Sequence, residues 1–296
     1  MPLAGYSVRS ATHASSDARL RRLHPACATI RATRPFHPIP ENPMRLLLML
    51  AALAMPLVAW LSQTGSLGPT NSEISDRYPT LLVAAGYAFS VWGLIFLLDI
   101  AFAGWQLRAA QRDNTTLARI RPAAIAGFAL TAAWMPVFTL QLFWLALAII
   151  WAALACLLYC ALVLARDPAP ARGQALWATV PVSLHAGWLA LAAFLNTAQV
   201  AVAYRLLPTD DMLPWSAALF AAAAALLLWA NQRMRGNVVF AAVALWGLVA
   251  VYRAQSASTL AGADTAAWIA AAIAVALAAQ TAWLVLRGGH RVRAAR

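Results

Sequence analysis

Long apolar runs alternate with short polar segments along most of the chain, and this pattern predicts membrane-spanning helices. About 20 apolar residues cross the roughly 30 Å hydrocarbon core of a bilayer. Because the core contains no water, backbone polar groups must pair within each segment, which favours helices. We therefore predict an all-α polytopic membrane protein, a bundle of about eight transmembrane helices. The predicted spans are Leu46–Leu61, Leu81–Leu107, Pro122–Leu140, Leu142–Ala165, Ala175–Ala203, Pro214–Ala230, Val238–Tyr252 and Ala266–Leu286.

The placement of arginine tests this count independently. All 22 basic residues are arginine, and cytoplasmic loops carry the excess of basic residues in membrane proteins. With eight spans, 19 arginines fall on one side, and only Arg77, Arg205 and Arg253 fall on the other. This asymmetry predicts that both termini are cytoplasmic. We also expect the membrane to be a bacterial inner membrane.

Composition narrows the class of protein further. The chain is 62% hydrophobic and 11% charged, with a mean hydropathy of +0.68, whereas soluble domains are about 25% charged. A soluble enzyme, a disulfide-rich secreted protein and a disordered protein are therefore excluded. The net charge of +12 does not indicate nucleic-acid binding, because the arginines are spread over five segments instead of one accessible face.

The chain divides into four segments by composition. Residues 1–43 form a basic leader that is either an arginine-rich targeting segment or a sequence preceding a true start at Met44; we favour the second interpretation. Residues 44–205 hold five predicted spans and residues 206–286 hold three more, which look like scaffold or a surface for another subunit. Residues 287–296 form a basic tail.

Polar and aromatic residues recur at helical spacing on three of the spans. On one span they lie within an arc of about 80° on a helix of 100° per residue, and the other two repeat the pattern. These three stripes are His185, Trp188, Ala192, Asn196 and Gln199; Trp92, Phe96, Asp99, Ala103 and Gln106; and Thr131, Trp134, Phe138 and Gln141. Polar members of such stripes face protein or a cavity and not lipid. They are explained either by hydrogen bonds between helices or by a polar-edged aromatic pocket.

Asp99 is the only acidic residue inside a predicted span, and an ionisable group within the membrane is a functional candidate. Asp99 and His185 both lie toward the cytoplasmic side of their spans. We therefore expect these two side chains to approach each other or to share a cavity. The pair is either functional or a neutral structural bridge.

Three sequence segments resemble signatures of the TspO/MBR family, the tryptophan-rich sensory proteins related to the mitochondrial translocator protein. Pro79 followed by Gly86–Phe96 (GYAFSVWGLIF) is similar to the signature of the second helix in that family. Ala133–Phe138 (AWMPVF) is similar to its third-helix signature, and Gly187–Asn196 (GWLALAAFLN) to its fifth. The three segments occur in the family's order.

The resemblance implies a five-helix bundle, often dimeric, that encloses an aromatic pocket for tetrapyrroles, sterols or drug-like ligands. Here, three C-terminal helices would follow that bundle. Two departures from the family pattern are Thr131, where asparagine is usual, and His185, in a region that normally holds Pro-Tyr. The pocket positions that the resemblance implies are Trp92, Trp134, Phe138, Trp188 and Asn196.

We therefore predict a membrane receptor or sensor that holds a hydrophobic, partly polar ligand. Its candidate ligand-binding residues are Trp92, Phe96, Asp99, Trp134, Phe138, His185, Trp188 and Asn196. A tetrapyrrole is a candidate ligand, no obligatory cofactor is expected, and the partners are the bilayer, the small ligand and a second copy of the chain. The alternatives are a transporter of such a ligand, a tetrapyrrole-modifying enzyme using Asp99 and His185, or a structural subunit. No catalytic residue set and no metal-ligand cluster is evident.

Overall fold

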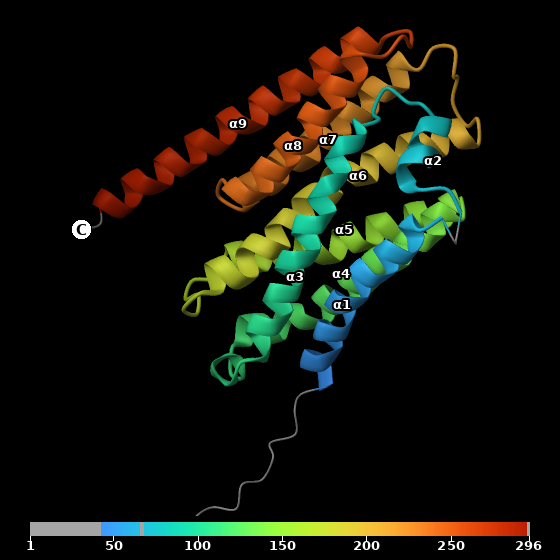
Figure 1. The fold of residues 1–296 in the computed structure, drawn as a ribbon. Coiled ribbons are helices and arrows are strands. Elements are labelled where there is room, and N and C mark those ends of the chain that lie inside the picture. Colours follow the sequence, from blue (N-terminus) through green and yellow to red (C-terminus); the bar gives the residue numbers. More distant parts are fainter. Residues whose placement is uncertain (1–42, 66–67, 295–296) are drawn as a thin grey trace, which may run out of the picture. The chain divides into compact units, whose positions relative to one another are not determined.

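The computed structural model describes residues 43–65 and 68–294, and the predicted leader lies almost entirely outside them. Within the described residues the secondary structure is helical (Figure 1). The α-helices are α1 (Pro43–Gln63), α2 (Asn71–Arg77), α3 (Val91–Leu107), α4 (Thr115–Thr139), α5 (Phe143–Ala165), α6 (Val180–Ala203), α7 (Leu213–Arg233), α8 (Val238–Ser256) and α9 (Ala263–Ala294). Short 3-10 helices, η1 (Gly86–Ser90) and η2 (Ala109–Gln111), flank α3, and a π-helical turn, η3 (Ala175–Thr179), leads into α6.

Eight of these helices are long and apolar enough to cross a membrane, so the predicted number of spans is confirmed. Many large apolar side chains on the outer faces of these helices are exposed, among them Leu50, Leu97, Trp268 and Val275. In a membrane protein such side chains contact lipid. The chain is therefore an integral membrane protein in contact with the bilayer.

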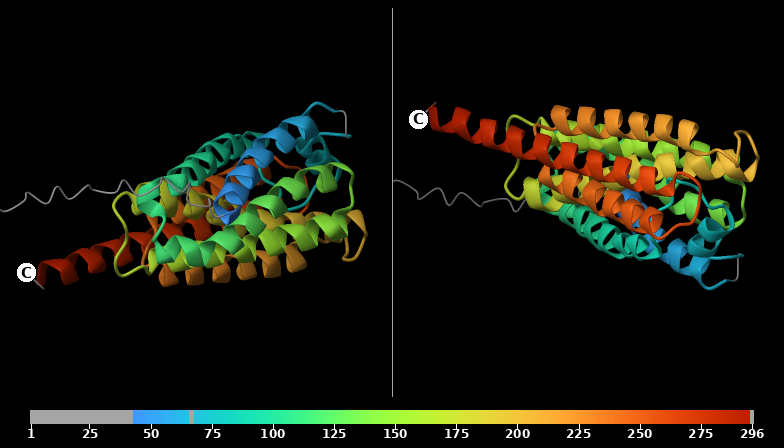
Figure 2. Two further views of the ribbon diagram at one scale, coloured as in Figure 1. Left: turned by 90° about the horizontal axis from the view of Figure 1, so that it is seen from below. Right: turned by 90° about the horizontal axis from the view of Figure 1, so that it is seen from above.

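The helix ends alternate between the two ends of the bundle (Figure 2). The beginning of α1 and the turns after α3, α5 and α7 therefore share one end, which we call the arginine-rich end. Within the described residues it carries Arg45, Arg108, Arg112, Arg119, Arg121, Arg166, Arg172, Arg233, Arg235 and Arg287. That this end is cytoplasmic remains a prediction of the positive-inside rule.

Helix α6 is the most buried span, with 78% of its most apolar window inside the protein, against 22% for α1 and for α9. It packs against α3, α5, α7 and α8. Two glycines allow α8 to lie close to it: a Cβ at Gly187 would come within 2.7 Å of the Phe240 carbonyl oxygen, and one at Gly247 within 2.5 Å of the Leu191 side chain. The fold therefore places the stripe of α6 at the centre of the bundle.

The predicted span Leu81–Leu107 begins too early, because the helical residues start at Gly86 with η1 and continue as α3 from Val91. Residues 81–85 form an irregular segment whose backbone groups are bonded to α8. The Ala85 N–H donates to the Ala250 carbonyl oxygen at 3.0 Å. The Gln255 side-chain amide donates to the carbonyl oxygens of Thr80 and Val83 at 3.1 and 3.2 Å. These distant partners replace the hydrogen bonds of a helix.

The short helix α2 was not predicted, although its start is visible in the sequence. Thr70 and Glu73 form a reciprocal capping box: the Glu73 N–H donates to Thr70 Oγ1 at 3.3 Å, and the Thr70 N–H donates to Glu73 Oε2 at 2.7 Å. The pattern Thr-x-x-Glu is a known signal for a helix N-terminus. Helix α2 contacts α4 and brings Ser75 to the edge of the site described below.

Candidate ligand-binding site

An aromatic cavity of about 40 Å³ lies between α3, α4 and α6, and it is covered by α2 and the segment that precedes α3. It is lined by Ser75, Val83, Ala84, Phe89, Trp92, Trp134, Phe138, Trp188, Ala192, Leu195, Asn196 and Gln199. None of these side chains carries a formal charge. The cavity therefore offers aromatic surface with a few neutral polar groups, the composition typical of sites for small organic ligands.

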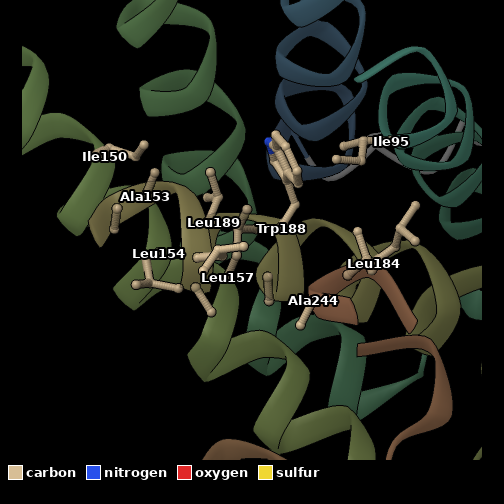
Figure 3. Close-up of a cluster of buried hydrophobic side chains, with 14 of the residues drawn as sticks. Ile95, Ile150, Ala153, Leu154, Leu157, Leu184, Trp188, Leu189 and Ala244 are labelled. Carbon is tan, nitrogen blue, oxygen red and sulfur yellow. The ribbon is translucent and has the colours of Figure 1, made fainter. Parts of the chain in front are cut away.

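The aromatic rings of the cavity contact one another in a continuous series. Trp134 stacks on Phe138 with ring centroids 4.8 Å apart, and Trp92 stacks on Trp134 at 6.5 Å. Trp188 meets Trp92 edge to face at 6.0 Å and 83°. Around Trp188, buried side chains such as Ile95, Leu157 and Ala244 belong to α3, α5 and α8 (Figure 3). Helices α3, α5 and α8, which pack against α6, hold the backbone that carries the indole.

Three buried polar atoms around the cavity have no hydrogen-bond partner: Trp92 Nε1, Trp188 Nε1 and Asn196 Nδ2. The orientation of the Asn196 amide follows from its neighbour, because the Trp134 indole can only donate. Trp134 Nε1 lies 3.1 Å from Asn196 Oδ1, so the amide nitrogen is left over. All three unpartnered groups are N–H donors, whereas buried polar groups in proteins are normally paired.

A wider groove adjoins the cavity on the side of α1. It has a volume of about 380 Å³ and is lined by Ala59, Trp60, Gln63, Asn71, Gly86, Phe89, Trp92, Gly93, Phe96 and Met135. Phe89 and Trp92 line both spaces. These two side chains therefore form the wall between cavity and groove.

Asp99 and His185 meet as expected, but they do not line the cavity. His185 Nδ1 lies 2.7 Å from Asp99 Oδ2, and both side chains are fully buried. His185 Nε2 lies 3.2 Å from Thr131 Oγ1, and the His185 ring meets the Trp92 ring edge to face with centroids 5.7 Å apart. The pair therefore lies behind the wall that Trp92 forms.

The Thr131 hydroxyl connects this pair to the backbone of α4. It donates to the Gly127 carbonyl oxygen at 2.9 Å and also lies 3.2 Å from His185 Nε2. The low dielectric of a membrane interior favours a buried pair without net charge.

A family model for TSPO-like proteins matches residues 45–283 of the chain. The chain belongs to the TSPO-like family. The match spans all eight membrane helices and extends well beyond the three segments that carried the resemblance. Neither a comparison with curated proteins nor one with solved structures finds a match. Family and fold together support a membrane protein that binds a ligand.

In this TSPO-like protein, five of the eight predicted site residues line the cavity: Trp92, Trp134, Phe138, Trp188 and Asn196. Phe96 lines the groove instead and stacks on Trp92 at 5.4 Å. The remaining two, Asp99 and His185, contact each other behind Trp92. The stripes of α3, α4 and α6 therefore converge in the half of the bundle away from the arginine-rich end, since Trp92 lies at the beginning of α3 and Phe138 at the end of α4.

The prediction missed the residues that cover the cavity, Ser75, Val83, Ala84 and Phe89. Ser75 lies on α2, Val83 and Ala84 lie in the irregular segment before η1, and Phe89 lies in η1, where the apolar span Gly86–Leu107 begins. The C-terminal helices of this TSPO-like protein support that segment: Trp246 Nε1 donates to the Ala88 carbonyl oxygen at 3.2 Å, and the Trp246 ring meets Tyr87 edge to face. Helix α8 is therefore part of the architecture of the site.

Proposed function

We propose that the protein is a membrane receptor or sensor that binds a hydrophobic ligand carrying hydrogen-bond acceptors in the cavity between α3, α4 and α6. The observation that carries this proposal is the set of three unpartnered donors, Trp92 Nε1, Trp188 Nε1 and Asn196 Nδ2, around an uncharged aromatic cavity. A buried donor without a partner costs about 1–3 kcal/mol. A carbonyl, ester or hydroxyl oxygen of the ligand would remove that cost.

The volumes indicate how a ligand would fit. Sites for drug-sized ligands measure about 300–1,000 Å³, so the cavity of about 40 Å³ is too small by itself. The groove of about 380 Å³ falls within that range by itself, but two of the three unpartnered donors, on Trp188 and Asn196, belong to residues that line only the cavity. A ligand of the size of a tetrapyrrole or a sterol would therefore occupy both spaces and displace the wall of Phe89 and Trp92.

The alternatives differ in what they require of the same residues. An enzyme that uses Asp99 and His185 needs at least one of them in contact with the ligand, and neither lines the cavity or the groove. Transport of the same ligand is compatible with the site. Cytoplasmic termini, a bacterial inner membrane and a homodimer remain predictions from the sequence.

Trp188→Phe tests the donor claim, because it keeps an aromatic ring and removes one unpartnered N–H. Affinity for protoporphyrin IX, measured by titration with the porphyrin's own fluorescence as signal, is expected to fall about 2- to 10-fold, the range of one neutral hydrogen bond. The control is Trp151→Phe on α5, whose N–H bonds to Thr197 Oγ1 at 3.2 Å and which does not line the cavity. Equal affinities for both variants and the wild type would refute the pocket.

The absence of charged side chains around the cavity predicts that the hydrogen-bond acceptor of the ligand is neutral, such as an ester oxygen, and not an ionised carboxylate. Burying an ionised carboxylate without a cationic partner is costly, and no charged side chain lines the cavity. Protoporphyrin IX dimethyl ester should therefore bind at least as tightly as the free acid in parallel titrations. A preference for the free acid of tenfold or more would argue against this cavity as the ligand site.

A further inference from the structure

Two arginines are buried at the arginine-rich end of the bundle, away from the aromatic cavity. Arg45, in the first turn of α1, is 7% exposed, and Arg121, in the second turn of α4, is 5% exposed. Both belong to the 19 arginines whose one-sided distribution orients the protein. Arginine is rarely buried unless it is paired, so their surroundings matter.

Arg45 joins the beginning of α1 to the end of α3. Its guanidinium group donates to the carbonyl oxygens of Gln106 and Arg108, the latter at 2.9 Å. The Gln106 side-chain amide returns a hydrogen bond to the Arg45 carbonyl oxygen at 2.8 Å. These hydrogen bonds fix the Arg45 side chain against the end of α3.

Arg121 lies close enough to Arg45 for the two positive charges to repel each other. Its Nε and Nη2 atoms are sealed from solvent and have no hydrogen-bond partner. Among residues 43–65 and 68–294, the one ion pair is Asp99–His185, so no described carboxylate balances Arg121. A buried, unpaired charge next to a like charge is unfavourable by several kcal/mol.

The two unpartnered atoms of Arg121 have a specific geometry. Nε and Nη2 lie along one edge of the guanidinium plane and donate in parallel, which matches two oxygens of a phosphate or carboxylate. We propose that Arg121 forms a binding site for a phosphate-type oxyanion at the arginine-rich end.

The depth of the site is compatible with two sources of phosphate. Arg121 is the seventh residue of α4, about 9 Å from the beginning of the helix at 1.5 Å per residue. The polar layer of each leaflet is about 5–8 Å thick, and an arginine side chain extends toward it. The phosphodiester of an anionic lipid and a free phosphate both reach this level.

The test compares the wild-type full-length chain with Arg121→Gln and with Arg119→Gln. Arg119 is the matched control. It lies two residues before Arg121 on α4, it is exposed, and its Nε donates a hydrogen bond to the Tyr159 hydroxyl at 3.2 Å. Each protein is melted in neutral detergent alone, with inorganic phosphate, and with phosphatidylglycerol against phosphatidylcholine in mixed micelles. Melting temperature is recorded against the concentration of each additive.

Without added anion, Arg121→Gln should melt at or above the wild-type temperature, since the substitution removes an unbalanced buried charge. The anion should raise the melting temperature of the wild type and of Arg119→Gln. For Arg121→Gln, the concentration needed for the same rise should be roughly 10- to 100-fold higher, as expected for hydrogen bonds to a charged group.

The two additives distinguish the source of the phosphate. Stabilisation by phosphatidylglycerol alone identifies a lipid headgroup, and stabilisation by inorganic phosphate identifies a free anion; both support the site. The proposal is overturned if neither additive stabilises the wild type more than it stabilises Arg121→Gln. It is also overturned if Arg121→Gln melts well below the wild type without anion, because Arg121 then already has a partner within the protein.

Discussion

Replacing Asp99 with alanine is expected to lower the free energy of unfolding by about 3–5 kcal/mol, the usual cost of removing one partner of a buried ion pair. His185 Nδ1 lies 2.7 Å from Asp99 Oδ2, and neither side chain is exposed. Without the carboxyl group, Nδ1 has no partner in an interior that water does not reach. The loss is measured by SDS titration of the purified protein in detergent, with helix content as the signal.

The size of the loss separates two roles for this contact. Hydrogen bonds between membrane helices contribute about 0.6 kcal/mol on average and about 1.7 kcal/mol at most. A loss above about 2 kcal/mol therefore identifies an orphaned ionisable group and not an ordinary interhelical hydrogen bond. The control Asp76→Ala removes an exposed carboxylate and should change stability by less than about 0.5 kcal/mol.

A double variant, Asp99→Leu with His185→Phe, completes this experiment. Replacing both members of a buried pair by apolar groups of similar size is often neutral, so most of the loss seen in Asp99→Ala should be recovered. A double variant as unstable as Asp99→Ala would contradict the assignment of the loss to the unpaired histidine. Because Trp92 rests against His185, porphyrin affinity of the double variant also reports whether the pair positions that indole.

The spans and the aromatic residues at the centre of the site were predictable because the bilayer imposes a small number of strict constraints on a helix. A helix in a bilayer needs a run of apolar residues, and a polar group on it must face protein. Helical spacing alone therefore predicts that Trp92, Trp134 and Trp188 each lie on the inward face of their helix. Their shared cavity also requires the three helices to be neighbours at the same depth, which the structure supplies and spacing does not.

At the ends of the stripes the same logic fails. Gln106 and Gln141 continue two stripes, yet neither lines the cavity. The Gln106 amide donates to the Arg45 carbonyl oxygen, and Gln141 Oε1 accepts from the Tyr78 hydroxyl at 3.1 Å. Near the ends of helices, loops and caps offer other partners, so spacing no longer indicates which group a side chain meets.

The cover of the cavity was not predictable because its partners are distant in sequence. The irregular segment before α3 is apolar, with Leu81 and Leu82 fully buried, and its pattern is compatible with a helix. Hydrogen bonds to Ala250 and Gln255 on α8 decide its conformation. A pattern within one segment contains no information on a helix that begins some 150 residues later.

Gly187→Ala is expected to produce the second large effect, because the α6–α8 contact leaves no room for a methyl group. The added Cβ would lie 2.5 Å from Val243 Cγ1, 2.7 Å from the Phe240 carbonyl oxygen and 3.2 Å from the Phe240 Cα. Two of these three atoms belong to the backbone of α8, so the whole helix must shift. Overpacking of this kind costs about 1–3 kcal/mol and occasionally more.

The matched control is Gly104→Ala in α3, where the nearest atom to the added Cβ is Met49 Cε at 3.6 Å, an ordinary contact. This variant should gain up to about 1 kcal/mol, because alanine is the better helix former. Melting temperature and porphyrin affinity are measured for both. Since α8 also holds the segment that covers the cavity, Gly187→Ala should weaken porphyrin binding as well as stability. A loss of stability with unchanged affinity would show that the position of α8 does not control the site.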